Sequence, residues 1–514
     1  MTPSASQDAL PSDAPLHAQE AARTLKAGKP SLVWRTVVAD SDTPVGAARR
    51  LIEPGRGDFL LESVEGGEVR GRYSLLGLDP DLVFRGSDRK AEVNPNWKRD
   101  REAFVACDGD ALTELRNLAN YCRIDVPEAL PSALACLVGY FGYETIGLVE
   151  TLPRAEPSKL ALPDMLFVRP TLILVFDRLS DELFCVAPLW PSEVDPAHAI
   201  AAASDRIDEA LRTLAQPAPA EPRAAADIAE PALTPVMEGD DYKAMVARAK
   251  DYIVAGDIFQ VVLAQRFTCP FTLPPLELYR ALRRVNPSPF LYFLDLPGFA
   301  IVGSSPEILV RVRDGEVTIR PIAGTRPRGA TRAEDDANEA SLIADPKERA
   351  EHLMLLDLGR NDVGRVASRG SVEVTDSFGI ERYSHVMHIV SNVVGALADD
   401  KDALDALFAG FPAGTVSGAP KIRACEIIAE LEPETRGAYA GGVGYFAPDG
   451  SVDSCIVLRT AVVKDEVMHV QAGAGIVADS DPDYELAECR AKAGALFAAA
   501  GEAVRRASEP RFGQ

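Results

Sequence analysis

Two pairs of glutamates in the sequence have a spacing that suits metal binding. Glu348 and Glu351 lie three residues apart in DPKERAEHLMLL, and Glu485 and Glu488 repeat that spacing in DPDYELAECRAKAG. Residues three apart share one face of a helix, so each pair directs two carboxylates the same way. Oxygen donors without Cys or His suit Mg²⁺, which keeps waters and bridges to an anionic substrate. The spacing alone also allows a solvent-facing surface.

The residues beside each pair favour the metal-site interpretation. An apolar run, residues 353–356, follows the first pair, and AGALFAAA follows the second, so both helices are expected to be packed. Burying carboxylates without a counter-charge costs several kcal/mol each, so a cation is expected between them.

Several other segments could bind an anion. In FPAGTVSGAPKIRACEIIAEL, a loop with Thr415 and Ser417 runs into a helix expected to begin at Pro420, beside Lys421. Backbone N–H groups at such a helix start can hold a carboxylate or phosphate, although a tight turn is the structural alternative. The loop lacks the GK[ST] ending of a Walker A motif.

Small residues and one isolated cation extend this pattern. QAGAGIVADSD places Gly473, Ala474 and Gly475 where backbone can approach a ligand closely. Arg459 is expected within the apolar strand CIVLRTAVV, and a cation there usually has an anionic partner from protein or ligand. Together with the glutamates, these segments predict a site for a small polyanion and Mg²⁺.

Composition argues against several other functions. The 514 residues include 77 acidic and 54 basic side chains, and a net charge of -23 would repel nucleic acid. No run approaches the roughly 20 apolar residues of a membrane helix. The eight cysteines form no CxxC and the six histidines no HExxH, so zinc and a disulfide framework are poorly supported. Scattered thiols and the absence of a signal-peptide pattern predict a cytoplasmic protein.

The elements that must position these residues have recognisable patterns. Asp345 is expected to cap the first glutamate helix, with Glu348 completing a capping box, and Asp481-Pro482 starts the second. IFQVVLAQRF predicts a strand with Gln260 on one face, and Asp314-Gly315 predicts a hairpin turn. An amphipathic helix is predicted to end at Gly256, and its apolar face is formed by Tyr242, Met245, Val246, Ala249, Tyr252 and Ile253. In the strand, the face opposite Gln260 is predicted to carry Phe259, Val261, Leu263 and Phe267.

These patterns indicate an α+β fold with large antiparallel sheets, a β-sandwich-like core surrounded by helices, and two interleaved subdomains. The Ala- and Pro-rich stretch over residues 215–235 is interpreted as a linker. It separates an N-terminal domain, residues 21–214, from a C-terminal domain, residues 236–505. Residues 1–20 are predicted to be a disordered tail.

The order and spacing of several motifs resemble the chorismate-utilising enzymes, and among them the anthranilate synthase component I branch. The resemblance covers about residues 30–500 and is dense after residue 240. It rests on PIAGTRPRG, EHLMLLDLGRNDVGRV, VMHIVSNVVG, PAGTVSGAPK, GGVGYF and QAGAGIVADSDPDYELAECRAKA.

The resemblance implies roles for the residues named above and for several others. Glu351 and Glu488 would bind Mg²⁺ directly, with Glu348 and Glu485 supporting through water. Glu307 would be the acid for the departing hydroxyl, and His388 would serve the elimination. Thr415 and Gln260 complete the implied catalytic set. The implied chorismate contacts are Gly324, Thr325, Tyr439, Arg459, Gly473, Ala474, Gly475 and Lys492.

Two positions separate branches of this family. Relatives that add water carry a lysine where this chain has Gln260, because a lysine can activate water and an amide cannot. Aminodeoxychorismate synthases typically have a lysine able to attack the ring, whereas Ala323 has no nucleophile. Both differences favour anthranilate synthesis. The alternatives are aminodeoxychorismate synthase component I and a catalytically silent tryptophan-binding regulator.

The resemblance further implies regulation and a partner. The N-terminal domain would be regulatory, binding L-tryptophan as a feedback inhibitor. Because no amidotransferase domain follows residue 500, a separate glutamine amidotransferase subunit is expected to deliver ammonia, in a complex of two copies of each chain. The implied tryptophan contacts are Leu61, Glu62 and Ser63 in FLLESVEGG, and Pro289, Phe290 and Leu291 in NPSPFLYF.

Overall fold

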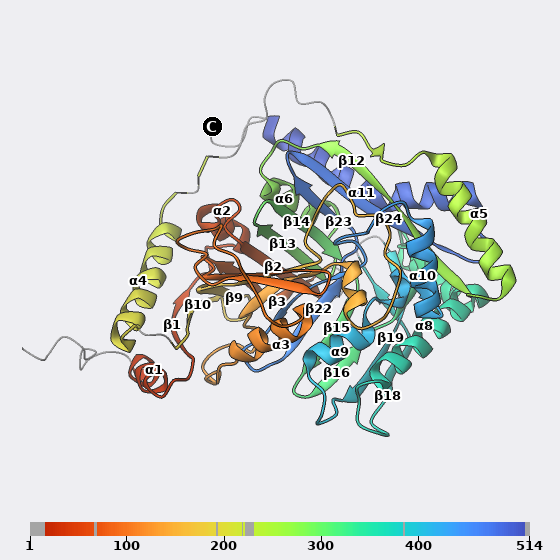
Figure 1. Ribbon diagram of the computed structural model, residues 1–514. Coiled ribbons are helices and arrows are strands. Elements are labelled where there is room, and N and C mark those ends of the chain that lie inside the picture. Colours follow the sequence, from red (N-terminus) through yellow and green to blue (C-terminus); the bar gives the residue numbers. More distant parts are fainter. Residues whose placement is uncertain are drawn as a thin grey trace, which may run out of the picture.

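The computed structural model describes residues 16–65, 69–191, 194–217, 219–220, 231–383 and 386–508. Within these residues, two antiparallel sheets of 12 strands each form the centre of the protein, and helices cover them (Figure 1). The predicted α+β fold with large antiparallel sheets is confirmed. None of the described helices combines the length and apolar composition needed to cross a membrane.

The first sheet combines strands from both ends of the chain. Its β20 (Gly418–Ala419) pairs with β12 outside the main order. The main order is β1 (Ser31–Val38), β10 (Glu182–Leu189), β9 (Leu172–Asp177), β3 (Val69–Leu78), β2 (Asp58–Glu65), β13 (Phe290–Leu296), β14 (Phe299–Ser305), β23 (Thr460–Lys464), β24 (Val467–Ile476), β12 (Gln260–Pro270) and β11 (Thr234–Pro235).

The second sheet is built in the same way. Its β18 (Glu373–Arg382) pairs with β19 beside the main order. The main order is β17 (Ile322–Pro327), β19 (Val386–Ala396), β16 (Glu316–Ile319), β15 (Ile308–Arg313), β22 (Val452–Ile456), β21 (Gly442–Phe446), β7 (Leu137–Phe141), β8 (Met165–Arg169), β4 (Leu82–Ser87), β5 (Lys90–Asn94) and β6 (Val105–Ala106).

The helices cover the sheets in groups. One group, α1 (Leu16–Lys26) and α4 (Pro196–Leu214), packs at the β1 end of the first sheet. The groups at the β12 end and over the second sheet comprise α5 (Gly239–Ala255), α6 (Pro275–Val285), α7 (Arg332–Ala344), α8 (Pro346–Gly364), α9 (Ala403–Gly410), α10 (Lys421–Leu431) and α11 (Pro482–Ser508). The remaining short helices are α2 (Pro44–Leu51), α3 (Ala111–Tyr121), η1 (Tyr143–Leu148) and η2 (Gly414–Val416).

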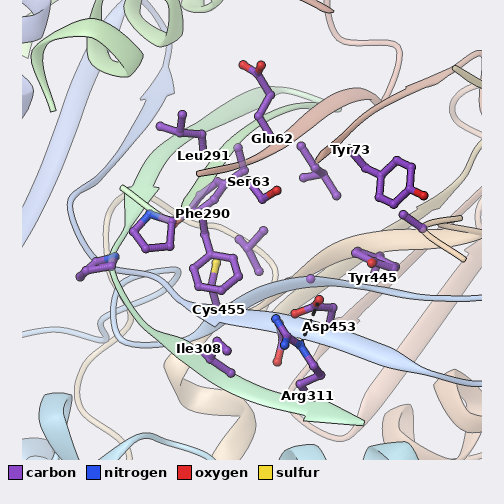
Figure 2. Close-up of a pocket in the computed structure, with 18 of the residues that line it drawn as sticks. Glu62, Ser63, Tyr73, Phe290, Leu291, Ile308, Arg311, Tyr445, Asp453 and Cys455 are labelled. Atoms are coloured by element: carbon purple, nitrogen blue, oxygen red, sulfur yellow. Dashed lines mark ion pairs between the residues drawn. The ribbon is translucent and has the colours of Figure 1, made fainter. Parts of the chain in front are cut away.

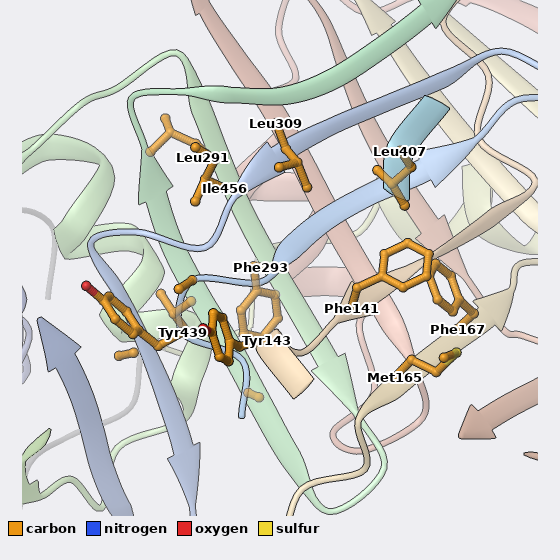
Figure 3. Close-up of a cluster of buried hydrophobic side chains, with 14 of the residues drawn as sticks. Phe141, Tyr143, Met165, Phe167, Leu291, Phe293, Leu309, Leu407, Tyr439 and Ile456 are labelled. Atoms are coloured by element: carbon orange, nitrogen blue, oxygen red, sulfur yellow. The ribbon is translucent and has the colours of Figure 1, made fainter. Parts of the chain in front are cut away.

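The two sequence regions on either side of residues 215–235 share both sheets. β2 pairs with β13, so that Ser63 lies opposite Phe290, and β7 pairs with β21. Figure 3 shows the same mixing in the core, where a single hydrophobic cluster contains Phe141 and Phe167 together with Leu309 and Ile456. Phe141 is packed edge-on against Phe167, with ring centroids 4.9 Å apart. The division into a regulatory and a catalytic domain stays a prediction.

Several local predictions are confirmed. α5 ends at Gly256, whose φ of 84° is the left-handed conformation that glycine adopts at helix ends. Asp314 and Gly315 have φ values of 52° and 74°, as a two-residue hairpin turn requires. The side chain of Asp345 caps α8 by accepting the N–H of Lys347.

Four local predictions need correction. Phe259 precedes β12 and is 73% exposed instead of joining its buried face. Glu348 forms no capping box, because its carboxylate bonds to Arg326 (3.1 Å). Residues 16–20 of the predicted tail are the start of α1, and the end of the predicted linker is β11. Residues 1–15 and linker residues 218 and 221–230 lie outside the described residues.

The chain crosses between the sheets at two adjacent places. One crossover, between β14 and β15, contains Glu307, and the other, between β22 and β23, contains Arg459. The crossovers are joined by two backbone hydrogen bonds, from Ile456 N to Glu307 O (3.1 Å) and from Ser304 N to Arg459 O (3.2 Å). Arg459 therefore lies between two strands. The prediction that it lies within a strand is wrong.

Candidate active site

Glu307 is a buried carboxyl that can hold a proton near neutral pH. Its side chain, 6% exposed, accepts a hydrogen bond from the Thr415 hydroxyl at 3.1 Å. Burial raises the pKa of Glu307 to about 7, although Thr415, Arg459 and Lys492 each act to lower it. A carboxyl with such a pKa is suited to general-acid catalysis.

Arg459 is held in an unusual backbone conformation beside this acid. Its φ of 47° lies in the left-handed region, which costs free energy for a residue with a Cβ. Burial lowers the pKa of Arg459, and the nearby Glu307 opposes that effect. No carboxylate of the described residues lies within ion-pair distance of its guanidinium, so Arg459 is available to an anionic ligand.

His388 lies on β19 directly opposite Thr325 of β17. Its Nδ1 lies 2.9 Å from the Gly324 carbonyl oxygen, which can only accept, so Nδ1 carries the proton and Nε2 the lone pair. Burial lowers the pKa of His388, and the ring is therefore a neutral base at physiological pH. Gly324 interrupts the pairing of β17 with a φ of 68°. This irregularity brings its carbonyl to His388.

A second wall is formed by β24, the middle of which is lined with small residues. Gly473 lies over the buried Tyr439, and a Cβ at Gly473 would be 2.8 Å from the Tyr439 hydroxyl oxygen. A Cβ at Gly475 would be 2.5 Å from the amide nitrogen of Gln260. Lys492 of α11 donates to the Gly473 carbonyl at 3.0 Å. The predicted residues on β12, β24 and α11 are thus brought together.

The two glutamate pairs face each other across the site. Burial raises the pKa of Glu351, and so do the negative charges of Glu348 and Glu488 on the same and the opposite helix. Glu485 is 6% exposed, and burial raises its pKa as well. Lys492 pairs with Glu488 at 2.7 Å and lowers the pKa of Glu351. The pairs are therefore close enough to repel each other.

This donor set fits Mg²⁺ only if other ligands complete the shell. In the described part of the chain, no three His, Cys, Asp or Glu side chains form a cluster that could hold a metal. Mg²⁺ is nevertheless commonly bound through one or two carboxylates, with waters and a substrate anion filling the other positions. The mutual repulsion at Glu351 is the physical reason why a cation would be stabilised there.

The polar side chains around the loop before α10 make other contacts than the sequence predicted. α10 begins after Pro420, as predicted. The Lys421 ammonium is buried in an ion pair with Asp362 (3.0 Å), and the Ser417 hydroxyl donates to the Ala413 carbonyl (2.8 Å). Both are therefore occupied within the protein, and only Thr415 of the three polar residues reaches the acid Glu307.

Comparison with known proteins places this arrangement in a family. The family model that describes the chorismate binding enzymes matches residues 59–498 of the sequence. The chain belongs to that family.

Relatives of the chain share most of its length. It is 54% identical over 486 residues to anthranilate synthase component 1 of Cereibacter sphaeroides, covering 94% of this chain and 96% of the relative. The identity to the Pseudomonas aeruginosa component 1 is 48% over 471 residues, 90% of this chain and 94% of the relative. The crystal structure of anthranilate synthase component I from Streptococcus pneumoniae matches with a TM-score of 0.73 at 35% identity, covering 83% of this chain and 92% of that one.

Beside the site around Glu307, this chorismate-binding enzyme has a cavity of about 550 Å³, called the second cavity below (Figure 2). Side chains from Phe290, Ile308 and Tyr445 contribute apolar surface, and Arg311 and Asp453 lie at its floor, 3.4 Å apart. All six residues implied in tryptophan binding line it, namely Leu61, Glu62, Ser63, Pro289, Phe290 and Leu291.

The alternation of β2 and β13 separates those six residues into two faces. Ser63 pairs with Phe290 and Glu62 with Leu291, so the two pairs point to opposite sides of the sheet. The Glu62 carboxylate is buried, accepts a hydrogen bond from Tyr279 (2.6 Å), and is directed away from the cavity in Figure 2. A ligand in the cavity would meet the side chains of Ser63 and Phe290, and at most the main chain of Glu62 and Leu291.

Two residues at the site were not predicted from the sequence. Arg326, within PIAGTRPRG, ties β17 to α8 by pairing with Glu348 (3.1 Å) and Asp345 (2.8 Å). Tyr383 packs against His388, with ring centroids 5.5 Å apart. Arg326 could have been found as a cation two residues after Gly324, whereas Tyr383 gave no sequence signal.

Proposed function

We propose that the chain catalyses the anthranilate synthase reaction, in which chorismate and ammonia give anthranilate, pyruvate and water. The observation that carries the proposal is the placement of a protonatable Glu307 beside Arg459, on the same site as the neutral base His388. The names of the relatives and the length over which they match support the same reaction.

Binding depends on charge complementarity. Chorismate carries two carboxylates, and Arg459 and the backbone N–H groups of residues 473–475 can neutralise and orient them. Thr325, Tyr439 and Lys492 would complete the contacts, with Tyr439 acting from beneath Gly473. The negative net charge of the chain makes such a locally positive surface necessary.

The first chemical step needs an acid. Ammonia adds at ring carbon 2 as the carbon 4 hydroxyl departs, and Glu307 gives that hydroxyl the proton with which it leaves as water. The hydrogen bond from Thr415 fixes the carboxyl for this transfer. Arg459 stabilises the carboxylate that remains.

The second step needs a base. His388 Nε2 takes the proton from ring carbon 2, the bond between ring carbon 3 and the enolpyruvyl oxygen breaks, and the ring becomes aromatic. The enolate that leaves takes up a proton from the medium and becomes pyruvate. The hydrogen bond between Nδ1 and the Gly324 carbonyl holds the ring in the tautomer that can accept this proton. An environment that disfavours the imidazolium also keeps the base unprotonated before the step.

Mg²⁺ is the cofactor that the glutamate pairs fit. Glu351 and Glu488 would hold it, with Glu348 and Glu485 supporting through water. When bound, it supplies positive charge that neutralises and orients the ring carboxylate.

Two residues favour ammonia over other nucleophiles. The Gln260 amide, packed on Gly475, cannot activate water as a lysine can. The buried Ala323 offers no amine to attack the ring. Aminodeoxychorismate formation is therefore the less favoured outcome.

Regulation and partners extend the proposal. The cavity lined by Ser63 and Phe290 would bind L-tryptophan as the feedback inhibitor, in a cytoplasmic enzyme of tryptophan biosynthesis. The name component 1 of the relatives supports a partner, which we propose is a glutamine amidotransferase subunit, in a heterotetramer. The chain alone should then use ammonium and not glutamine, and efficient glutamine use without a partner would contradict this part of the proposal.

One assay tests the function. The purified chain is incubated with chorismate, Mg²⁺ and ammonium at elevated pH, where more of the ammonium is free ammonia. Fluorescent anthranilate is the expected product. Accumulation of aminodeoxychorismate would replace the proposed reaction by the folate-pathway one, and no turnover with retained tryptophan binding would favour a silent regulator.

A further inference from the structure

Tyr383 lies between the active site and the second cavity. Its side chain is 7% exposed, and one part of it packs against the imidazole of His388, with an angle of 60° between the rings. The residue also lines the cavity, together with Glu381 and Arg320. Tyr383 is therefore a wall that the two sites share.

The position of the Tyr383 ring is set by a chain of polar contacts. Its hydroxyl donates to Glu381 Oε2 at 2.8 Å, and Glu381 forms an ion pair with Arg320. Its carbonyl oxygen accepts a hydrogen bond from Arg328 at 2.6 Å. Glu381 stands opposite His388 in the pairing of β18 with β19. A movement of the Glu381 side chain would therefore be passed to His388 through a single side chain, the ring of Tyr383.

The same end of the cavity touches the segment that carries the acid. Pro306 and Ile308, on either side of Glu307, both line it. The charge of Glu307 also raises the pKa of the Tyr383 hydroxyl, after burial and Glu381. A ligand that fills this end would contact the supports of both the acid and the base.

We propose that Tyr383 is a positioning residue that orients His388 and transmits occupancy of the cavity to the catalytic site. His388 Nδ1 lies 2.9 Å from the Gly324 carbonyl and 3.1 Å from the Thr325 hydroxyl, and the packing of Tyr383 limits rotation of the imidazole about these contacts at one end of the ring. A ligand that displaces Tyr383 moves His388 out of line without touching the substrate. The transmission half rests on the proposed tryptophan feedback through this cavity.

Energetics allow an effect of measurable size. Misplacing a catalytic group by about 1 Å can cost roughly a hundredfold in rate. Coupling between two sites typically changes affinity by about 5- to 150-fold. An effector acts only through its different affinity for the two arrangements, and here the arrangements differ in the position of Tyr383.

The test compares Tyr383→Phe and Tyr383→Leu with a matched control. Tyr252→Phe removes a similar Tyr–Glu hydrogen bond (2.7 Å to Glu430), but on α5, where the residue neither lines the second cavity nor belongs to the proposed site residues. Each variant is assayed with ammonium for kcat, chorismate KM and the pH dependence of kcat. Tryptophan binding is measured by calorimetry, separately from tryptophan inhibition.

We expect Tyr383→Leu to lower kcat about ten- to a hundredfold with little change in KM. The acidic limb of the pH dependence of kcat should move to higher pH in this variant, because water admitted beside His388 relieves the burial that lowers the pKa of His388. Arg459, which lowers that pKa, and Glu381, which raises it, remain in place. Tyr383→Phe should bind tryptophan but be inhibited at least about fivefold less strongly. The control should match wild type.

Two results would overturn the proposal. If kcat and its pH dependence in both Tyr383 variants match the Tyr252→Phe control, Tyr383 does not position His388. If both variants bind tryptophan and remain inhibited like wild type, the cavity acts through another route. A wild-type protein that is not inhibited by tryptophan would remove the feedback proposal and the transmission half, while the pH dependence would still decide the positioning half.

Discussion

Glu307 and Arg459 are set side by side by two crossovers that hydrogen-bond to each other. The backbone bonds that join them, Ile456 N to Glu307 O and Ser304 N to Arg459 O, are part of the junction between the sheets. The guanidinium lowers the pKa of the carboxyl, and burial raises it to about 7. The acid and the anion receptor therefore keep their spacing because the two short crossovers that carry them are bonded to each other and anchored at both ends by strands.

Replacing Glu307 by Gln should abolish anthranilate formation while leaving the fold intact. The amide keeps the shape and can still accept the Thr415 hydrogen bond, but it has no proton to give to the leaving hydroxyl. Product fluorescence with saturating chorismate and ammonium measures the effect. Activity within about tenfold of wild type would show that another group is the acid.

The same variant should change the pH dependence of stability. The folded pKa of Glu307, about 7, lies above the ordinary glutamate pKa of 4.5, so between these values the folded state holds a proton that the unfolded chain has released. Stability from this group is present below the lower value and lost as pH rises through the folded pKa. Between pH 4.5 and 8, the free energy of unfolding of Glu307→Gln should therefore rise by about 3 kcal/mol relative to that of wild type. Denaturant titration at each pH measures this difference.

Glu351→Gln and Glu488→Gln should each abolish activity at ordinary Mg²⁺ concentrations. Each removes one negative charge from the proposed ligand set. In the absence of Mg²⁺, Glu351→Gln should also relieve repulsion and raise thermal stability, whereas Glu488→Gln should raise it less because it also breaks the ion pair with Lys492. A Mg²⁺ titration of activity and of melting temperature measures both effects. The matched control is Glu502→Gln, also on α11 and paired with Arg505. Wild-type Mg²⁺ dependence in both site variants would exclude a metal shared by the two helices.

Ser63→Phe should relieve inhibition by tryptophan with little change in the uninhibited rate. The Ser63 side chain lines the cavity and lies against Gly71, where an added Cβ would be 1.9 Å from Ser63 Oγ, so we expect the larger phenylalanine ring to occupy cavity space. Chorismate saturation curves with and without tryptophan check this. Equal inhibition of both proteins would place the inhibitor elsewhere.

Lys421→Met should reduce stability without changing chorismate KM. It leaves Asp362 buried without its counter-charge, which typically costs about 3–5 kcal/mol. The double variant Lys421→Met with Asp362→Leu should recover most of the loss. A raised KM in the folded Lys421→Met protein would restore Lys421 to the anion-binding role that its sequence position indicated.

Periodicity and turn chemistry made much of the fold predictable. α5, the Asp314-Gly315 hairpin and the start of α8 follow from local patterns, and the structure agrees with them. The error at Phe259 has a different cause, because the alternation of β12 cannot show where pairing begins. Whether an apolar residue at a strand end is covered depends on neighbours that come from elsewhere in the chain.

The kinds of residue in the site were easier to predict from the sequence than the residues that they contact. Arg459 was recognised as a cation in need of an anion, but its crossover position and left-handed backbone depend on how two sheets join. Lys421 was interpreted as a group that binds a ligand, because its actual partner Asp362 lies 59 residues earlier and the local sequence does not reveal that contact. Tyr383 follows β18 and contacts His388 of β19, and nothing in its local sequence separates it from an ordinary packed aromatic residue.

The sharing of both sheets by distant segments bears on how the chain is made. β2 lacks its neighbour β13, and β7 lacks β21, until more than 200 residues of further chain have been synthesised. Until then both strands expose unpaired edges, which are templates for aggregation. Residues 16–217 therefore cannot be expressed as a stand-alone sensor without two open edges, and the high contact order makes folding of the whole chain slow.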